Sequence, residues 1–113
     1  IVNIASIFGV ISKEKRAAYS STKWGLLGFT KATSLDLAPF NVLVNAVSPG
    51  FVDTDLTRKI LGSRNMQQLV KTIPQRRLAK PNEIAKVVLF LCGDQNTYIT
   101  GQNIIVDGGF TSA

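Results

Sequence analysis

The hydrophobic residues of the chain fall into three short apolar runs, separated by longer segments of mixed polarity. The runs are "IVNIAS" at 1–6, "NVLVNAV" at 41–47 and "QNIIVDGG" at 102–109. Short apolar runs that are rich in β-branched residues and bounded by turn residues are typical of buried strands. We therefore expect three buried strands, the first of them ending at Ser6.

Two of the segments between these runs carry helix signals. Residues 17–38 form a helix pattern that stops at Pro39, because proline cannot continue a helix. Residues 81–92 begin with a proline, followed by Asn82 as the expected cap and by Glu83 in the first turn. The sequence thus predicts a helix before the second strand and another before the third.

The remaining segments are polar. Residues 7–16 are expected to form a loop, and residues 51–80 a long irregular segment with one short helix near 64–72. Long irregular segments in compact domains are usually functional. We expect 51–80 to be the mobile part of the chain.

The order strand, helix, strand, helix, strand indicates an α/β fold with a parallel sheet and right-handed crossovers. Ligands of such sheets bind outside the carboxyl ends of the strands. The sequence places Ser6, Pro49 with Gly50, and the turn at 107–109 along this one edge.

The composition indicates a globular protein and bears on membrane, disulfide and metal-binding classes. The 113 residues are 45% hydrophobic and 18% charged, which is typical of one soluble globular domain. No run is long enough to span a membrane, and the apolar start without Met suggests a piece of a longer chain that begins within a strand. The single cysteine, Cys92, allows no intrachain disulfide, so we expect it to pack in the core of a cytoplasmic protein. With no histidine and one cysteine, no metal site is expected.

The net charge of +6 raises the question of nucleic-acid binding. The basic residues are dispersed over loops at 13–16, 58–64 and 76–77, with no aromatic residues between them to stack on bases. We therefore expect no nucleic-acid partner, and interpret these residues as a rim that is either solvated or steers an anionic substrate. Arg76 and Arg77 have the same two interpretations.

Tyr19 and Lys23 stand four positions apart on the expected helix. Four residues turn a helix to within about 40° of its starting direction, so the two side chains share one face. A phenol has a pKa near 10, and a neighbouring ammonium stabilises the phenolate. Such a pair is common on helix surfaces, so its meaning depends on the residues around it.

Those surroundings form an ordered set. Ser6 ends the first strand thirteen residues before Tyr19, and Pro49-Gly50-Phe51-Val52-Asp53-Thr54 follows the second strand. Together with "RRLAKPNEIAKVVLFL" and "TGQNIIVDGG", the set resembles the short-chain dehydrogenase/reductase family over nearly all 113 residues. That family has a strand-end Ser, a Tyr-x-x-x-Lys on the next helix and a Pro-Gly-x-x-x-Thr after the next strand. The sequence looks most like its 3-oxoacyl-acyl-carrier-protein reductase branch and the sugar and polyol dehydrogenases.

The resemblance implies an oxidoreductase that transfers hydride between NAD or NADP and a small carbonyl or secondary alcohol, with carrier-linked substrates included. It makes Tyr19 the proton donor or base. Lys23 then lowers the pKa of Tyr19 and hydrogen-bonds the nicotinamide ribose, while Ser6 holds the substrate oxygen. The implied cofactor-binding residues are Tyr19 and Lys23 together with Pro49 and Gly50 along the nicotinamide, and the Val52 backbone and Thr54 hydroxyl at its carboxamide.

The sequence departs from the family pattern in two ways. The glycine-rich phosphate loop belongs to an N-terminal half that these residues do not include, so the expected fold is the C-terminal half of a Rossmann-like, doubly wound parallel sheet (β-α-β-α-β), with 1–113 as one partial domain. The family's catalytic asparagine lies upstream too; Asn3 is within the strand and is interpreted as structural. The alternative function is a catalytically inactive fragment that serves only as a binding or oligomerisation module. Loss of the upstream half is expected to expose the edge of the first strand to pairing.

A stripe of small residues marks one face of the first helix: Ser21, Gly25, Gly28 and Ala32. Each glycine inside a helix costs about 1 kcal/mol relative to alanine, so the stripe indicates close packing. By the family resemblance the partner is a second subunit of a homo-oligomer; the alternative is the sheet of the parent protein itself. Trp24 is expected to be a core or interface anchor, and Asp107 a turn residue without a role in catalysis.

Overall fold

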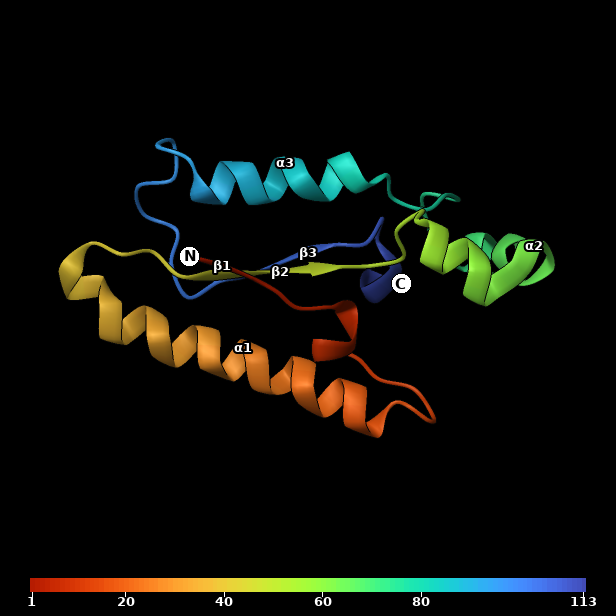
Figure 1. Cartoon of the computed structure of the whole chain (residues 1–113), viewed down its shortest axis with the longest axis horizontal. Helices are drawn as coiled ribbons and strands as arrows, with labels where there is room; N and C mark the ends of the chain where they lie inside the picture. The colour runs from red at the N-terminus through yellow and green to blue at the C-terminus, as the bar shows by residue number, and fades with distance from the viewer.

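A three-stranded parallel sheet runs through the centre of the molecule (Figure 1). The computed structural model describes residues 1–113 apart from the side chain of Ser63. The strands lie in the order β1 (Val2–Ile4), β2 (Asn45–Pro49) and β3 (Asn103–Val106), and both pairings are parallel. The predicted α/β fold with a parallel sheet is confirmed.

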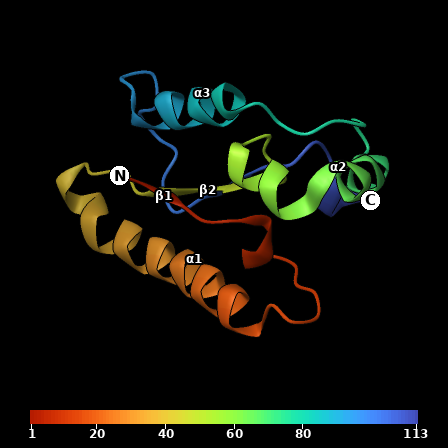
Figure 2. The same ribbon diagram turned by 45° about the vertical axis from the view of Figure 1, so that its right-hand side comes forward.

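A long helix covers each face of this sheet. Helix α1 (Ala17–Leu37) lies along one face and α3 (Pro81–Cys92) along the other, as the two ribbon views show (Figures 1 and 2). Helix α2 (Asp55–Thr72) extends away from the sheet beyond the carboxyl ends of the strands. Three short 3₁₀-helices complete the chain: η1 (Ile7–Gly9), η2 (Ala38–Phe40) and η3 (Phe110–Ser112).

The core is built around the middle strand. Residues 44–48 are all buried, and two of them, Asn45 and Ser48, are polar. The Ser48 hydroxyl donates to the side-chain oxygen of Asn103 on β3 at 2.7 Å. The Asn45 side chain donates to the Ile99 carbonyl at 2.7 Å. Because buried polar groups are costly unless they are hydrogen-bonded, these bonds fix the register of the middle strand against the last segment of the chain.

The strands differ from the predicted runs in burial and in extent. Only β2 is buried as expected, because β1 and β3 lie at the two edges of the sheet in this chain and are partly exposed. The second strand covers residues 45–49 instead of 41–47, because Asn41 ends η2 in the left-handed conformation (φ 57°). The first strand stops at Ile4, since Ser6 already caps η1. The third ends at Val106, where Asp107 starts a turn through two glycines of positive φ.

Residues 51–80 are more helical than predicted. In place of a short helix at 64–72, α2 begins at Asp55 and has a break at Gly62, whose backbone is not helical (φ 66°, ψ 166°). Thr54 caps the helix, because its hydroxyl oxygen accepts from the Thr57 N–H at 3.2 Å. The mobility expected of this segment remains a prediction.

Helix α3 begins as predicted at Pro81, but its cap is different. The capping residue is Lys80 and not Asn82, because Pro81 occupies the first helical position. Glu83 then reaches back and accepts a hydrogen bond from the Lys80 N–H at 2.7 Å. The carboxylate half of a capping box therefore starts the helix.

The surface of this chain bears on three further expectations. A Cβ atom added to Gly25 or Gly28 would have no heavy atom of this chain within 4 Å, so the small-residue stripe makes no close contact within residues 1–113, and what packs on it remains a prediction. Trp24 is 53% exposed and lies outside the core of this chain. Cys92 is exposed at the end of α3 and does not pack in the core. Among the described residues, no helix has the length and apolar character required to cross a membrane.

Candidate active site

The carboxyl ends of the three strands bring the expected site residues to one edge of the sheet. Ser6 follows β1, Pro49 is the last residue of β2, and Asp107 comes directly after β3 (Figure 1). Helix α1 starts beyond this edge and runs back along the sheet, which carries Tyr19 and Lys23 past the end of β1.

Lys23 is fixed at the end of the first strand. Its ammonium donates to the carbonyl of Ile4, the last residue of β1, at 2.9 Å. The same nitrogen lies 5.8 Å from the centre of the Tyr19 ring, so the two side chains share one face of α1 as predicted. The absence of a side chain at Gly9 lets η1 pack closely on the backbone of α1. A Cβ at Gly9 would lie 3.1 Å from the Lys23 carbonyl oxygen.

Ser6 is buried two residues after Ile4, the strand residue that Lys23 contacts. Its hydroxyl oxygen accepts a hydrogen bond from the Phe8 N–H at 3.2 Å, which starts η1. In the part of the chain that the structure describes, no acceptor takes the hydroxyl hydrogen of Ser6. That hydrogen is available to a substrate oxygen.

A row of four aromatic rings joins the loops of this edge, and sequence reasoning missed it. Tyr19 packs edge-to-face on Phe8 (centroids 6.1 Å apart), Phe8 on Phe51 (6.5 Å) and Phe51 on Phe110 (5.1 Å). Edge-to-face pairs contribute about 0.5–1.5 kcal/mol beyond the area they bury. The sequence contains one feature that could have predicted this row: all three phenylalanines lie within four residues after the end of a strand.

Gly50 has a packing reason to be glycine. A Cβ there would lie 2.7 Å from the Cβ of Asp107 and 2.8 Å from its Cα, so the ends of β2 and β3 approach closely only because the side chain is missing. The Gly50 N–H also donates to the Val106 carbonyl at 2.9 Å. These contacts explain the glycine without any ligand.

The segment expected to hold the nicotinamide carboxamide offers a free backbone donor. The Thr54 hydroxyl oxygen accepts from the Thr57 N–H and shares a hydrogen bond with the Thr57 hydroxyl, in which either group can be the donor. The Val52 carbonyl accepts from the Thr54 N–H at 3.0 Å, but the Val52 N–H donates to none of the residues described. This backbone N–H can therefore donate to a carboxamide oxygen.

Asp107 organises the turn after the last strand. One carboxylate oxygen accepts from the Gly109 N–H at 2.9 Å, and the other from the N–H and hydroxyl of Thr111, both at 2.7 Å. Partial burial acts to raise the pKa of Asp107, but these hydrogen bonds outweigh it and hold the pKa below its ordinary value. The side chain thus acts as the expected turn residue.

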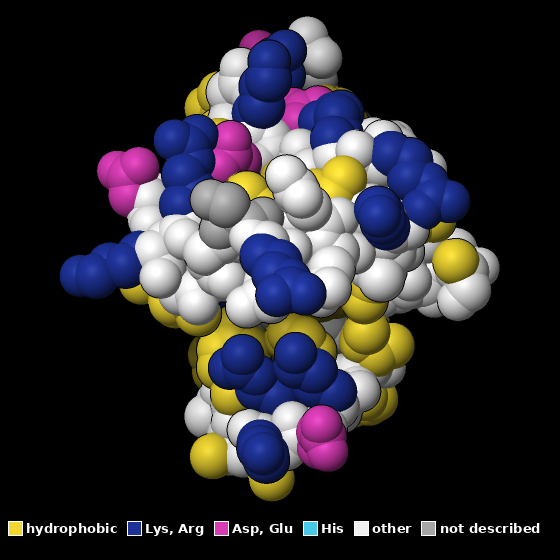
Figure 3. Space-filling view, turned by 90° about the vertical axis from the view of Figure 1, so that its right-hand side faces the viewer, with side chains coloured by type: hydrophobic (Ala, Val, Ile, Leu, Met, Phe, Trp, Pro, Cys, Tyr) yellow, Lys and Arg dark blue, Asp and Glu magenta, His cyan; other side chains and the backbone are white. Residues whose placement is uncertain are grey.

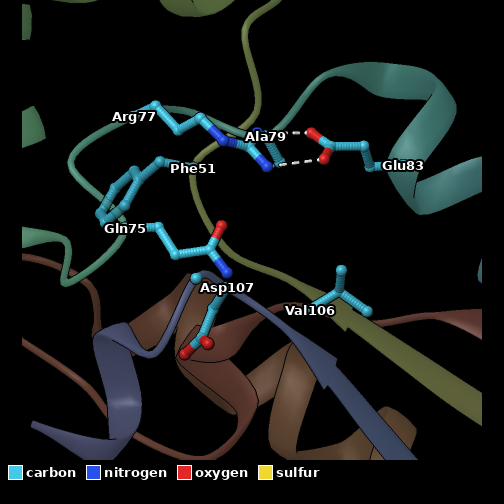
Figure 4. A pocket seen from close by; sticks show the side chains of 8 residues that line it. Phe51, Gln75, Arg77, Ala79, Glu83, Val106 and Asp107 are labelled. Carbon is cyan, nitrogen blue, oxygen red and sulfur yellow. Dashed lines mark hydrogen bonds and ion pairs between the residues drawn. The ribbon is translucent and has the colours of Figure 1, made fainter.

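A cavity of about 160 Å³ lies between this turn and the start of α3, lined by Phe51, Gln75, Arg77, Ala79, Glu83 and Asp107 among others (Figure 4). Arg77 and Glu83 face each other across its rim in a two-pronged ion pair, with both N–O distances 2.7 Å. The Arg77 hydrogen bonds and the Lys80 N–H hold the pKa of Glu83 at about 2. Arg77 is therefore neither simply solvated nor free for an anionic substrate.

Positive charge is concentrated at this edge of the molecule. Segments 10–16 and 51–80 contain ten of the thirteen Lys and Arg residues and three of the seven Asp and Glu residues. Figure 3 views the molecule from this side and shows basic side chains spread over the face with few acidic ones among them. Such a field favours the approach of anions.

Comparison with known proteins agrees with this geometry. Residues 1–111 match the family model described as Enoyl-(Acyl carrier protein) reductase. The chain is 50% identical over 109 residues to the 3-oxoacyl-(acyl-carrier-protein) reductase FabG of Aquifex aeolicus, which covers 96% of this chain and 44% of that protein. The chain therefore spans less than half the length of this curated relative.

The chain also resembles solved structures along its whole length. The chain is similar to a 4-hydroxyisoleucine dehydrogenase complexed with NADH, with a TM-score of 0.94, 34% identity, and coverage of 100% of this chain and 47% of that one. It is also similar to ElxO with NADP bound, with a TM-score of 0.92, 32% identity, and coverage of 100% and 46%. In each case the matched part is about half of the neighbour.

Proposed function

Because the chain belongs to the short-chain dehydrogenase/reductase family, in the group that its family model describes as Enoyl-(Acyl carrier protein) reductase, we propose that it forms the catalytic portion of an NAD(P)-dependent oxidoreductase. The reaction interconverts a carbonyl and a secondary alcohol. One observation supports this proposal most strongly: Lys23 is bonded to the end of β1 on the same side of α1 as Tyr19.

In the proposed mechanism, the Tyr19 hydroxyl gives its proton to the carbonyl oxygen during reduction and accepts it during oxidation. The Ser6 hydroxyl donates a hydrogen bond to the same oxygen and opposes its developing negative charge. The Lys23 ammonium favours the phenolate left after proton transfer and donates to the nicotinamide ribose. The bound cofactor supplies or accepts the hydride at the carbonyl carbon.

The cofactor is NAD or NADP, since one structural neighbour holds NADH and another NADP. Within this chain, the Val52 N–H binds the carboxamide, while Pro49 and Gly50 lie along the nicotinamide ring. The Thr54 hydroxyl is the second group at the carboxamide in this proposal, and it also caps α2, which fixes the position of the preceding backbone. The substrate is a small carbonyl or alcohol, and the FabG relative makes a carrier-linked acyl chain a candidate.

The test is made on the full-length protein that contains this chain, with a panel of ketones and secondary alcohols. Tyr19→Phe and Lys23→Met should each lower kcat/KM by at least about 100-fold, which is the usual scale of acid–base catalysis. Tyr98→Phe is the matched control, because Tyr98 is 95% exposed and far from the carboxyl ends of the strands. Loss of less than a few-fold in Tyr19→Phe would show that the phenol is not the proton donor.

We further propose that the protein is a homo-oligomer whose subunits meet on the face of α1 that carries Gly25 and Gly28. The proposal is supported by the bare backbone at Gly25 and Gly28 and by the exposed rings of Trp24 and Phe29. A glycine surface lets a second helix approach closely, and aromatic residues are enriched in interfaces.

A further inference from the structure

Two backbone hydrogen bonds hold the segment that carries the free Val52 donor. The Ala79 N–H donates to the Phe51 carbonyl at 2.9 Å, and the Asp53 N–H donates to the Ala79 carbonyl at 2.8 Å. Together they form an isolated parallel bridge between Val52 and Ala79, outside the main sheet. Val52 is therefore fixed from both sides, while its own N–H remains free among the described residues.

Ala79 is itself held by the ion pair between Arg77 and Glu83. The pair closes the short loop on both sides of Ala79, with two bonds of 2.7 Å (Figure 4). Glu83 also accepts from the Lys80 N–H at 2.7 Å, which joins the loop to the first turn of α3. Because α3 packs against the sheet, the loop takes its position from a rigid element.

Side-chain packing supports this segment only in part. The Phe51 ring packs on Phe8 and Phe110. Phe51 and Ala79 also line the cavity of about 160 Å³, and where the loop borders this open space its position depends on hydrogen bonds rather than on close packing. The ion pair is also exposed, with side-chain exposures of 49% and 35%, so its expected contribution to global stability is small.

We propose that the Arg77–Glu83 ion pair is a positioning device for the nicotinamide end of the cofactor site: through Ala79 it holds the Val52 N–H where the carboxamide is bound. Neither charged residue touches the cofactor, so both are positioning residues and not catalytic ones. The inference rests on the proposed function, because it requires a nicotinamide at Val52.

The test compares two ligands on the full-length protein. Glu83→Gln and Arg77→Met should each weaken NADH binding by about 3- to 10-fold, which corresponds to the loss of one hydrogen bond. Binding of ADP-ribose, which lacks the nicotinamide, should stay within two-fold of the wild type. If the protein prefers NADPH, then NADPH and 2′-phospho-ADP-ribose replace these ligands. Asp94→Asn is the control, because it makes the same kind of change just beyond the other end of α3.

A second measurement requires no cofactor. Hydrogen exchange of the Asp53 and Ala79 amides should accelerate in both variants and stay unchanged in Asp94→Asn, because these two amides form the bridge. Equal weakening of both ligands, or unchanged NADH binding, would overturn the inference, since a general structural defect affects both ends of the cofactor. If the wild type binds neither ligand, the proposed function fails instead.

Discussion

The close approach of β2 and β3 at Gly50 allows a quantitative test. In Gly50→Ala, the new methyl carbon would lie 2.7 Å and 2.8 Å from the Cβ and Cα of Asp107, closer than any ordinary contact between carbon atoms. The backbone cannot simply move aside, because the Gly50 N–H is bonded to the Val106 carbonyl at 2.9 Å. The ends of the two strands must therefore separate.

Overpacking of this kind costs about 1–3 kcal/mol. Replacing glycine by alanine also restricts the unfolded chain, which returns about 0.5–1 kcal/mol. Because the two contacts at Gly50 are so short, we expect the upper part of that range, about 2–3 kcal/mol, and hence a net loss for Gly50→Ala of about 1–2.5 kcal/mol. Gly9→Ala is the graded comparison, since its nearest contact is 3.1 Å and its second is the flexible end of Leu27 at 3.2 Å. Its net effect should stay within about 1 kcal/mol of zero.

Urea denaturation of the full-length variants measures both values. Gly50→Ala should also weaken NADH binding, because Phe51 and Val52 follow directly in the chain and move with the strand end. A Gly50→Ala protein as stable as the wild type would refute the packing argument. So would a Gly9→Ala protein that loses as much stability as Gly50→Ala.

Three further predictions concern the core, the last turn and the oligomer. Asn45→Ala removes two hydrogen bonds between a fully buried amide and residues 99–102. It should lower the free energy of unfolding, measured by urea denaturation, by about 2–5 kcal/mol. The control Asn82→Ala, at an exposed position, should lower it by less than about 0.5 kcal/mol. The lowered pKa of Asp107 means that its stabilisation is present above the ordinary value of 3.8 and lost as the pH falls through the lower folded value. The stability difference between wild type and Asp107→Asn should therefore shrink on acidification below pH 3.8, and a difference that grows would contradict the assignment. Gly28→Trp should reduce the oligomer to a smaller species in light scattering, while an unchanged mass would exclude this face as the interface.

The residues that the sequence predicts best are those with local signals. The helix predicted at 17–38 agrees with α1 within one residue, because a long run of helix-compatible residues ends at a proline. Ser6, Tyr19 and Lys23 come to the same end of the sheet because strand order and helix periodicity fix their positions. Their roles in catalysis remain predictions.

The misplaced elements have long-range or conformational causes. The second strand lies further along the chain than predicted because Asn45 and Ser48 look unlike core residues, and their partners lie more than fifty positions away. The start of α2 escapes prediction because the helix packs on no face of the sheet and therefore shows no clear apolar stripe. Asn41, in the left-handed conformation, ends a turn where the pattern suggests a strand.

The geometry of the candidate site is fixed by contacts within this chain. Lys23 is bonded to β1, and the row of aromatic rings joins α1 to the loops after all three strands. The bridge at Ala79 holds residues 51–53, and Asp107 closes the last turn. All of these contacts join residues of this chain. Under the proposed function, substitutions elsewhere in the full-length protein, at the residues that would bind the adenosine, should therefore weaken cofactor binding without moving Tyr19, Lys23 or Val52. A change in the proton-transfer step caused by such a substitution would show that the two halves position this site jointly.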